Sequence, residues 1–484
     1  MRRFFAAALL TLTGAAAAEP AASVAFEHCE IQGGTGSNRH YAQCAKLSVP
    51  ETPDGSATVQ LTVARKPATT GQSASDALVI INGGPGGASI PLLADYWGVF
   101  SLLGAERDVI AMDQRGTGAS NPMHCEQLTD LSGDPSLAAL ESATQECLDQ
   151  VNGDPAAYTT SAAVRDLETL RQALGYTQLT IYGVSYGTRV AQHYLRRFPQ
   201  HTRGVILDGV VPPNEVLGAP IIRHSQATLE ALFARCAEQP ACNDAFGDLS
   251  QHLNTLRERF TRTPARTIQL KHPVTSEPIT FDLMYAHVAA SVRFMLYSPE
   301  SAALIPLILH RAAELQDYQP IAAQAVLTLE QLAASIATGM QNSVMCTEDA
   351  PFFGAQERDV ASLNATYLGA DLVTGLEAIC DVWPRGSMDE DLRTLVESDT
   401  PVLVLSGEHD PITPPAWGDA ILSGLTGARH LVAPGQGHGV IARGCVPRLA
   451  ADFVESLDAD ALDASCLESL GGFPFFIDTL GPSP

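Results

Sequence analysis

The stretch Gly183-Val184-Ser185-Tyr186-Gly187 decides the fold that we expect for this chain. Residues 178–182, just before it, are rich in β-branched and aromatic side chains and predict a buried strand. Residues 188–198, just after it, carry apolar side chains at helical spacing and are followed by Pro199. A G-x-S-x-G motif between a strand and a helix is typical of a nucleophile elbow, a tight turn that exposes the serine hydroxyl. The alternative is a glycine-rich turn that carries an inert serine.

Strand and helix patterns alternate on both sides of this elbow. An unbroken apolar run at residues 77–81 predicts a central strand covered on both faces, and residues 108–112, 204–208 and 401–405 predict further strands. Residues 161–174 have an amphipathic pattern that predicts a helix covering the sheet. The alternation predicts an α/β fold with a mainly parallel sheet and right-handed crossovers.

Helical periods replace this alternation in the middle of the chain. We therefore expect a helical cap at residues 211–398, inserted into a core made of residues 19–210 and 399–484. Residues 1–18 have a positive start, an apolar run and a small-residue cleavage site, so they predict a secretory signal peptide. No other stretch reaches ~18 uninterrupted apolar residues, so we expect no membrane contact after cleavage. These features predict an exported protein, periplasmic or secreted.

Charge and cysteine content narrow the function further. The formal net charge of −25 argues against nucleic acid or an anionic membrane as a partner. An even number of cysteines in an exported chain predicts disulfides, and no CxxC spacing favours zinc. From proximity alone we expect sequential pairs, although other connectivities stay open: Cys29 with Cys44, Cys125 with Cys147, Cys236 with Cys242, Cys346 with Cys380, and Cys445 with Cys466.

A glycine cluster, Asn82-Gly83-Gly84-Pro85-Gly86-Gly87, directly follows the predicted strand 77–81. Glycines there allow the backbone to approach a ligand closely. α/β-Hydrolases use a loop at this place for one oxyanion amide, and the residue after the nucleophile supplies the other. The candidates are therefore Gly83 or Gly84, together with Tyr186. No Lys-Ser/Thr follows, which excludes a phosphate-binding loop, whereas a plain turn remains an alternative.

Ser185 needs a base, and the base needs an orienting acid. Asp410 follows the predicted strand 401–405, and His438 follows the next strand pattern along the chain. This order of serine, acid and histidine, with each at the end of a strand, predicts a catalytic triad. Glu408 is the competing acid, but Asp410 stands before a proline turn, which suits the acid better.

Several motifs together resemble those of the proline iminopeptidases and, more closely, of the secreted tripeptidyl aminopeptidases among the α/β-hydrolases. They are Asn82–Gly87, Asp113-Gln114-Arg115-Gly116-Thr117-Gly118, Gly183–Thr188, Leu207-Asp208-Gly209 and Gly407-Glu408-His409-Asp410-Pro411. The resemblance runs from about Ile81 beyond His438 and is weaker in the cap. One departure is Asn82, where the iminopeptidases usually have histidine.

The resemblance implies a serine aminopeptidase that acts on peptides with a free N-terminus. It would release short fragments, such as tripeptides, or single residues, and it implies no metal and no organic cofactor. The resemblance also implies acids on the cap that bind the substrate ammonium, and the matching residues are Glu348 and Asp349, beside Cys346. They could equally be two surface acids. An esterase or lactone hydrolase with the same triad is the first alternative, and a non-catalytic exported binding protein is the second.

Overall fold

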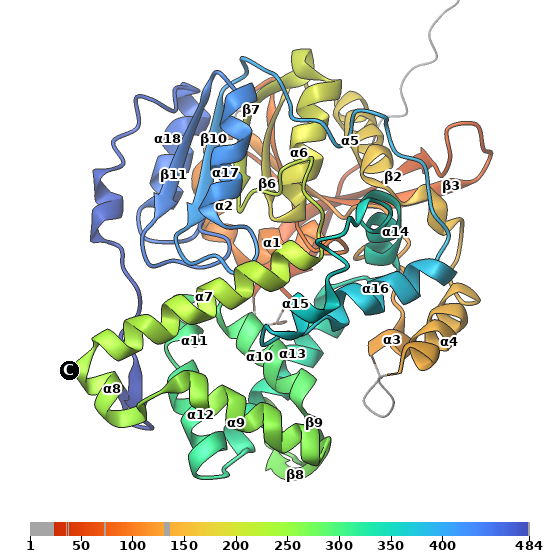
Figure 1. Ribbon diagram of the computed structural model, residues 1–484. Helices are drawn as coiled ribbons and strands as arrows, with labels where there is room; N and C mark the ends of the chain where they lie inside the picture. Colours follow the sequence, from red (N-terminus) through yellow and green to blue (C-terminus); the bar gives the residue numbers. More distant parts are fainter. Residues whose placement is uncertain (1–23, 35, 37, 72–73, 130–135, 483–484) are drawn as a thin grey trace, which may run out of the picture.

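A nine-stranded mixed sheet forms the centre of the molecule (Figure 1). The computed structural model describes all residues except 1–23, 35, 37, 72–73, 130–135 and 483–484. In order across the sheet, the strands are β1 (Glu27–Gln32), β2 (Arg39–Pro50), β3 (Thr58–Lys66), β5 (Asp108–Met112), β4 (Ala77–Ile81), β6 (Leu179–Val184), β7 (Thr202–Asp208), β10 (Val402–Gly407) and β11 (Ala428–Ala433). β1, β2 and β3 pair antiparallel, β3 pairs antiparallel with β5, and all pairs from β5 to β11 are parallel.

The apolar runs of the sequence form the middle of this sheet. All five residues of β4 are buried, and alternate side chains enter the two faces. Val79 and Ile81 belong to one hydrophobic cluster, whereas Leu78 and Ile80 belong to the other. A strand that buries both faces needs a continuous apolar run, and this is the pattern that predicted the parallel sheet.

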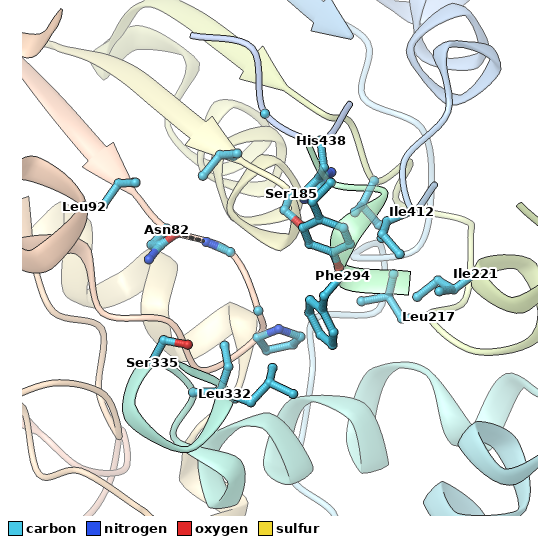
Figure 2. A pocket seen from close by; sticks show the side chains of 18 of the residues that line it. Asn82, Leu92, Ser185, Leu217, Ile221, Phe294, Leu332, Ser335, Ile412 and His438 are labelled. Carbon is cyan, nitrogen blue, oxygen red and sulfur yellow. Dashed lines mark hydrogen bonds between the residues drawn. The ribbon is translucent and has the colours of Figure 1, made fainter. Parts of the chain in front are cut away.

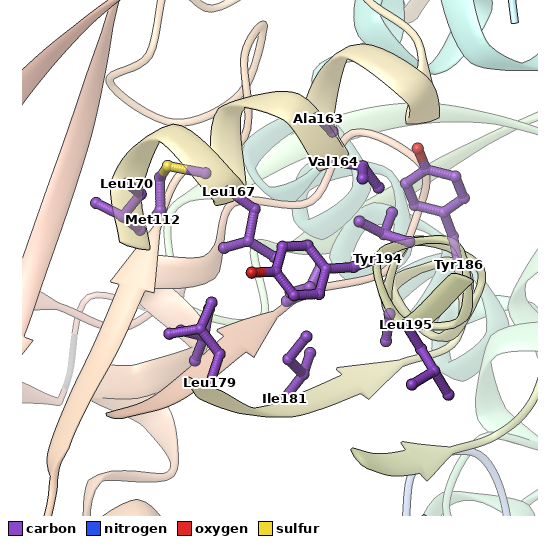
Figure 3. Packing of buried hydrophobic residues seen from close by; sticks show 14 of the residues in the cluster. Met112, Ala163, Val164, Leu167, Leu170, Leu179, Ile181, Tyr186, Tyr194 and Leu195 are labelled. Atoms are coloured by element: carbon purple, nitrogen blue, oxygen red, sulfur yellow. The ribbon is translucent and has the colours of Figure 1, made fainter. Parts of the chain in front are cut away.

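Helices cover both faces of the sheet. One face packs against α5 (Thr160–Leu174), α6 (Tyr186–Arg197) and α17 (Pro415–Ile421). The other packs against α1 (Ser89–Asp95), α2 (Trp97–Leu103) and α18 (Val446–Ser456). Figure 3 shows Leu167 of α5 and Tyr194 of α6 packed over Ile181 of β6. This layered arrangement confirms the predicted α/β-hydrolase fold.

The segment between β7 and β10 contributes no strand to the central sheet. Its longer helices are α7 (Ala219–Glu238), α9 (Leu249–Arg262), α10 (Tyr285–Met295), α12 (Ile305–Glu314), α13 (Gln319–Ser335), α14 (Thr338–Glu348) and α16 (Asp371–Val382). They lie together below the sheet in the view of Figure 1, in green to cyan. The segment also contains a hairpin that the helical periods did not predict, formed by β8 (Ala265–Lys271) and β9 (Pro278–Met284). Its strands alternate between exposed and half-buried residues, so they lack the apolar runs used to find the others.

The end of the chain differs from the prediction that all of residues 399–484 belong to the core. Phe475 is buried in the hydrophobic cluster formed by α7 to α13. The Phe476 amide donates a hydrogen bond to the Ala303 carbonyl (3.2 Å). The guanidinium of Arg235 also lies 4.5 Å from the centre of the Phe475 ring. The tail therefore packs against the cap segment.

Five disulfides confirm the predicted sequential pairing, Cys29–Cys44, Cys125–Cys147, Cys236–Cys242, Cys346–Cys380 and Cys445–Cys466. Disulfides persist in oxidising compartments, so they indicate an extracellular or exported protein. In the described part of the chain, no helix is long and apolar enough to cross a membrane. The predicted signal peptide lies outside the described residues.

Candidate active site

Ser185 lies at the sharp turn between β6 and α6, as the motif predicted. Its φ and ψ are 56° and −127°, in a region that residues with a side chain rarely adopt. The turn brings Gly187 against β4, where a Cβ atom would lie 2.4 Å from the Ile81 carbonyl oxygen. Only glycine fits so close an approach. The sequence therefore stores strain at Ser185, which holds its hydroxyl at the C-terminal edge of the sheet.

The predicted acid and base meet at the same edge. Asp410 lies in the loop after β10, and His438 lies in the loop after β11. The Nδ1 atom of His438 is 2.8 Å from Oδ2 of Asp410. Figure 2 shows Ser185 beside His438, and both line one cavity. The arrangement brings together a hydroxyl, an imidazole and a carboxylate in the order that proton abstraction from serine requires.

Asp410 is held by more groups than His438. Its Oδ1 atom accepts hydrogen bonds from the amides of Ile412 (2.9 Å) and Thr413 (2.8 Å). The Thr413 hydroxyl donates to Oδ2 (2.7 Å) and lies 3.1 Å from Nδ1 of His438. The competing acid, Glu408, is 52% exposed at its side chain and accepts a hydrogen bond from the Gly435 amide. The geometry therefore favours Asp410 as the orienting acid.

The surroundings of His438 make it a stronger base than an ordinary histidine. Burial lowers the pKa of its imidazole, but the charge and hydrogen bond of Asp410 outweigh burial and raise this pKa above its usual value. The His438 amide donates to the Tyr297 carbonyl (2.9 Å), and the two rings lie 4.9 Å apart. Buried Asp208 accepts hydrogen bonds from the amides of Val440 and Ile441, so it fixes the loop that carries His438.

Two glycines of the loop, Gly83 and Gly84, line the cavity that contains Ser185, and their backbone amides differ in hydrogen bonding. The backbone amide of Gly83 donates to the side-chain oxygen of Asn82 (2.8 Å; Figure 2), while the side-chain nitrogen of Asn82 donates to the Ala88 carbonyl. Within the described part of the chain, the amides of Gly84 and Tyr186 have no such acceptor. Tyr186 is also the first residue of α6, where the helix dipole favours negative charge. Of the two predicted glycines, the geometry therefore favours Gly84 with Tyr186 as the pair that could hold an oxyanion.

A segment of the cap holds this loop in place. The Ala337 amide donates to the Gly86 carbonyl (3.0 Å), and Ile336 pairs with Gly87 as an isolated bridge. Ile336 and Ser335 then line the cavity in front of Ser185. Contact between the cap and the glycine loop thus closes one side of the site.

Glu348 and Asp349 do not occupy the position that the resemblance implied. Both side chains are fully buried, and neither lines the cavity. Asp349 forms a bidentate pair with Arg189 (3.0 Å for both bonds). Glu348 accepts hydrogen bonds from the amide (2.7 Å) and hydroxyl (2.6 Å) of Thr160. The prediction that these acids bind a substrate ammonium is therefore wrong, because protein groups already occupy their oxygens.

The cavity has a volume of about 790 Å³. Apolar side chains make up much of its wall, among them Leu217, Ile221, Phe294, Leu332 and Ile412 (Figure 2). Among the described residues, no aspartate or glutamate lines it. The described residues also contain no group of three or more histidine, cysteine, aspartate or glutamate side chains that could hold a metal ion. The cavity suits a largely apolar substrate with a polar bond at Ser185, and Arg293 and Arg443 add positive charge to its wall.

Three groups of the site were not predicted. Thr413 lies three residues after Asp410, and this spacing was a usable signal for a carboxylate-capped turn. Asp208 stands in a motif quoted above, but that motif did not indicate its role, and Tyr297 gave no local signal. Both depend on the pairing of distant segments, since Tyr297 contacts His438 and Asp208 contacts the loop that carries it.

The family model of the alpha/beta hydrolase fold matches residues 76–442. Serine protease Hip1 from Mycobacterium tuberculosis is 34% identical over 227 residues, which cover 42% of this chain and 42% of that protein. The match thus spans less than half the length of this relative. Carboxylesterase B from the same organism is 28% identical over 439 residues, covering 81% of this chain and 79% of that protein. Tripeptidyl aminopeptidase from Streptomyces lividans is 28% identical over 193 residues, covering 36% of each.

Proposed function

Because this chain belongs to the α/β-hydrolase fold family, we propose that it is an exported serine peptidase that cleaves short peptides through an acyl-enzyme on Ser185. The observation that carries this proposal is the hydrogen bond between Asp410 and His438, in the same cavity as the strained Ser185. Relatives named serine protease and tripeptidyl aminopeptidase support a peptide as the substrate.

In the proposed mechanism, Nε2 of His438 accepts the Ser185 proton as the hydroxyl oxygen attacks the scissile carbonyl. The amides of Gly84 and Tyr186 donate to the oxyanion. His438 then gives its proton to the leaving amine, and the acyl group stays on Ser185. Water, deprotonated by His438, releases the acyl group and restores the serine. Asp410 keeps the proton of the ring on Nδ1 throughout, with Thr413 fixing the carboxylate.

Release of short fragments from a free N-terminus is the finer part of the proposal. Its support is the named tripeptidyl aminopeptidase relative, since the predicted cap acids do not face the cavity. Equal cleavage of free and N-acetylated peptide anilides by the wild type would remove this part and leave the peptidase.

An esterase is the second candidate. The cavity is largely apolar and no described carboxylate lines it, and the relative named carboxylesterase spans most of the chain. A single comparison of peptide anilides with p-nitrophenyl esters of matched acyl chains separates the two. Hydrolysis of the esters without the anilides would favour the esterase.

Substitution of the nucleophile tests the shared mechanism. Ser185→Ala should abolish labelling by a fluorophosphonate probe and lower kcat by roughly three or more orders of magnitude. Ser335→Ala is the matched control, because Ser335 lines the same cavity away from the elbow. Retained hydrolysis by Ser185→Ala, in a preparation free of contaminating enzyme, would disprove the assignment.

A further inference from the structure

The charge of the cavity is opposite to that of the protein. The chain has 54 acidic residues against 29 lysines and arginines. Two arginines, Arg293 and Arg443, nevertheless line the cavity, and no aspartate or glutamate among the described residues does so. A cavity with this lining attracts negatively charged groups and disfavours cations.

Arg293 lies close to the reacting groups. It belongs to the last turn of α10, four residues before Tyr297. The Tyr297 ring lies 4.9 Å from the His438 ring, and the Tyr297 carbonyl accepts the His438 amide. The positive charge of Arg293 acts on His438, since it opposes the rise in the pKa of the imidazole caused by Asp410. An anion bound at Arg293 would therefore lie in the same cavity as Ser185 and near enough to His438 to act on its charge.

The charge of Arg293 has no counter-ion among the described residues. No carboxylate of a described residue forms an ion pair with it, and its Nε atom is buried without a hydrogen-bond partner. Its neighbours are the Phe294 ring, 5.2 Å away, and the hydroxyl of Tyr297, whose pKa burial raises, so that it stays neutral.

Several other arginines of the protein are paired with carboxylates. The buried Arg115 pairs with Asp166 (2.7 Å), and Arg107 pairs with Asp76 (3.0 Å). Even Arg443, at the same cavity, pairs with Glu300 (2.8 Å). Arg235 and Arg266 resemble Arg293 in having a buried Nε atom without a hydrogen-bond partner, but neither of them lines this cavity. An unpaired guanidinium in a partly desolvated wall costs free energy, and a substrate carboxylate would recover it.

We propose that Arg293 binds a carboxylate of the substrate of Ser185, so that the peptides cleaved here carry a negative charge close to the scissile bond. This proposal rests on the proposed function of the same site. The carboxylate belongs either to an acidic side chain or to the free C-terminus of a short peptide. A guanidinium suits both, because its planar fork matches two carboxylate oxygens.

Two pairs of substrates distinguish these sources. The first pair is a peptide anilide with glutamate or glutamine beside the anilide, and the second is tetra-alanine with a free or an amidated C-terminus. In at least one of the two pairs, kcat/KM of the wild type should be roughly 10–100-fold higher for the charged substrate than for the neutral one, as for a hydrogen-bonded ion pair. The pair that shows this preference identifies the source of the carboxylate. Arg293→Gln should bring this ratio close to one, and Arg293→Lys should keep part of it. Arg448→Gln removes an exposed arginine of α18 and should keep the full ratio.

Fluorophosphonate labelling shows whether each variant is folded with an active serine. A wild-type ratio of one or below in both pairs overturns the proposal, as does a ratio that survives in a labelled Arg293→Gln. If the wild type is labelled but cleaves no peptide, the proposed peptidase function fails. The carboxylate site is then tested with two esters, p-nitrophenyl hydrogen glutarate, which is charged, and p-nitrophenyl butyrate, which is neutral. The ratio of their kcat/KM values should behave in the wild type and the variants as described for the peptides.

Discussion

Glu348 lies in a buried cluster with Asp349 and Arg189, beside the half-buried Arg393, and its replacement by glutamine gives a measurable pH effect. Arg189 is 2% exposed at its side chain, and Glu348 and Asp349 are both 0% exposed. Asp349 holds the guanidinium through two bonds, whereas Glu348 lies 3.9 Å from it. Removal of this carboxylate from water and the nearby charge of Asp349 both favour the protonated form of Glu348. Burial raises the pKa of Glu348 from 4.5 to about 7.

The sign of the effect follows from proton binding. Between pH 4.5 and about 7 the folded protein holds the Glu348 proton more tightly than the unfolded chain does. The stabilisation is therefore full below pH 4.5 and is lost as the pH rises through about 7. A pKa difference of this size corresponds to about 3 kcal/mol, since one pKa unit is worth ~1.4 kcal/mol. Glutamine stays neutral and its side-chain oxygen can still accept the hydrogen bond from the Thr160 amide. The stability of Glu348→Gln should therefore not fall in this way as the pH rises.

Urea unfolding followed by circular dichroism, at several pH values from 4 to 8 with the disulfides intact, measures the effect. The free energy of unfolding of the wild type minus that of Glu348→Gln should fall by about 3 kcal/mol across the series. Glu390→Gln, which removes an exposed carboxyl, is the matched control and should show no comparable change. A difference between wild type and Glu348→Gln that is constant with pH would refute the reasoning.

Further predictions concern the orienting acid and the base. Asp410→Asn should lower kcat by about 10³–10⁴-fold through the wrong tautomer of His438, measured with any cleaved substrate, and a larger loss in Glu408→Gln would mean that the acid is misassigned. Thr413→Val removes a hydrogen bond to a buried carboxylate and should lower kcat/KM by roughly 10–100-fold without loss of folding, checked by kinetics and thermal unfolding. Because the raised pKa of His438 must be exceeded for it to accept a proton, kcat/KM should fall on acidification with a midpoint above 6.5; a midpoint below that value would contradict the role of Asp410.

The central strands could be predicted because burial on both faces demands a continuous apolar run. The predicted runs 77–81 and 108–112 coincide with β4 and β5. Strands with one open face leave a weaker pattern, which is why β1 and the hairpin of β8 and β9 were not predicted. Packing of the C-terminal tail on the cap has no local signal at all, because it depends on side chains more than 150 residues away.

The order of residues along the chain predicted the members of the triad, but it could not predict which way a side chain of the cap points. Ser185, Asp410 and His438 each follow a strand, and parallel strands bring their C-terminal ends to one edge. Whether Glu348 faces the cavity or the interior depends on Arg189, which is 159 residues away in the sequence. No sequence pattern indicates this role of Arg189. Arg293 was not predicted for the same reason, since whether an arginine has a counter-ion depends on the folded chain.

The disulfides also bear on how the chain is assembled. No pair encloses a cysteine of another pair, and the widest pair is separated by 34 residues. A chain that enters an oxidising compartment from its N-terminus therefore presents its thiols two at a time, each with its native partner next to arrive. An oxidant that joins consecutive thiols gives the whole native set without any exchange step. A non-native disulfide can then form only if a native pair is still reduced when the first cysteine of the next pair enters the compartment.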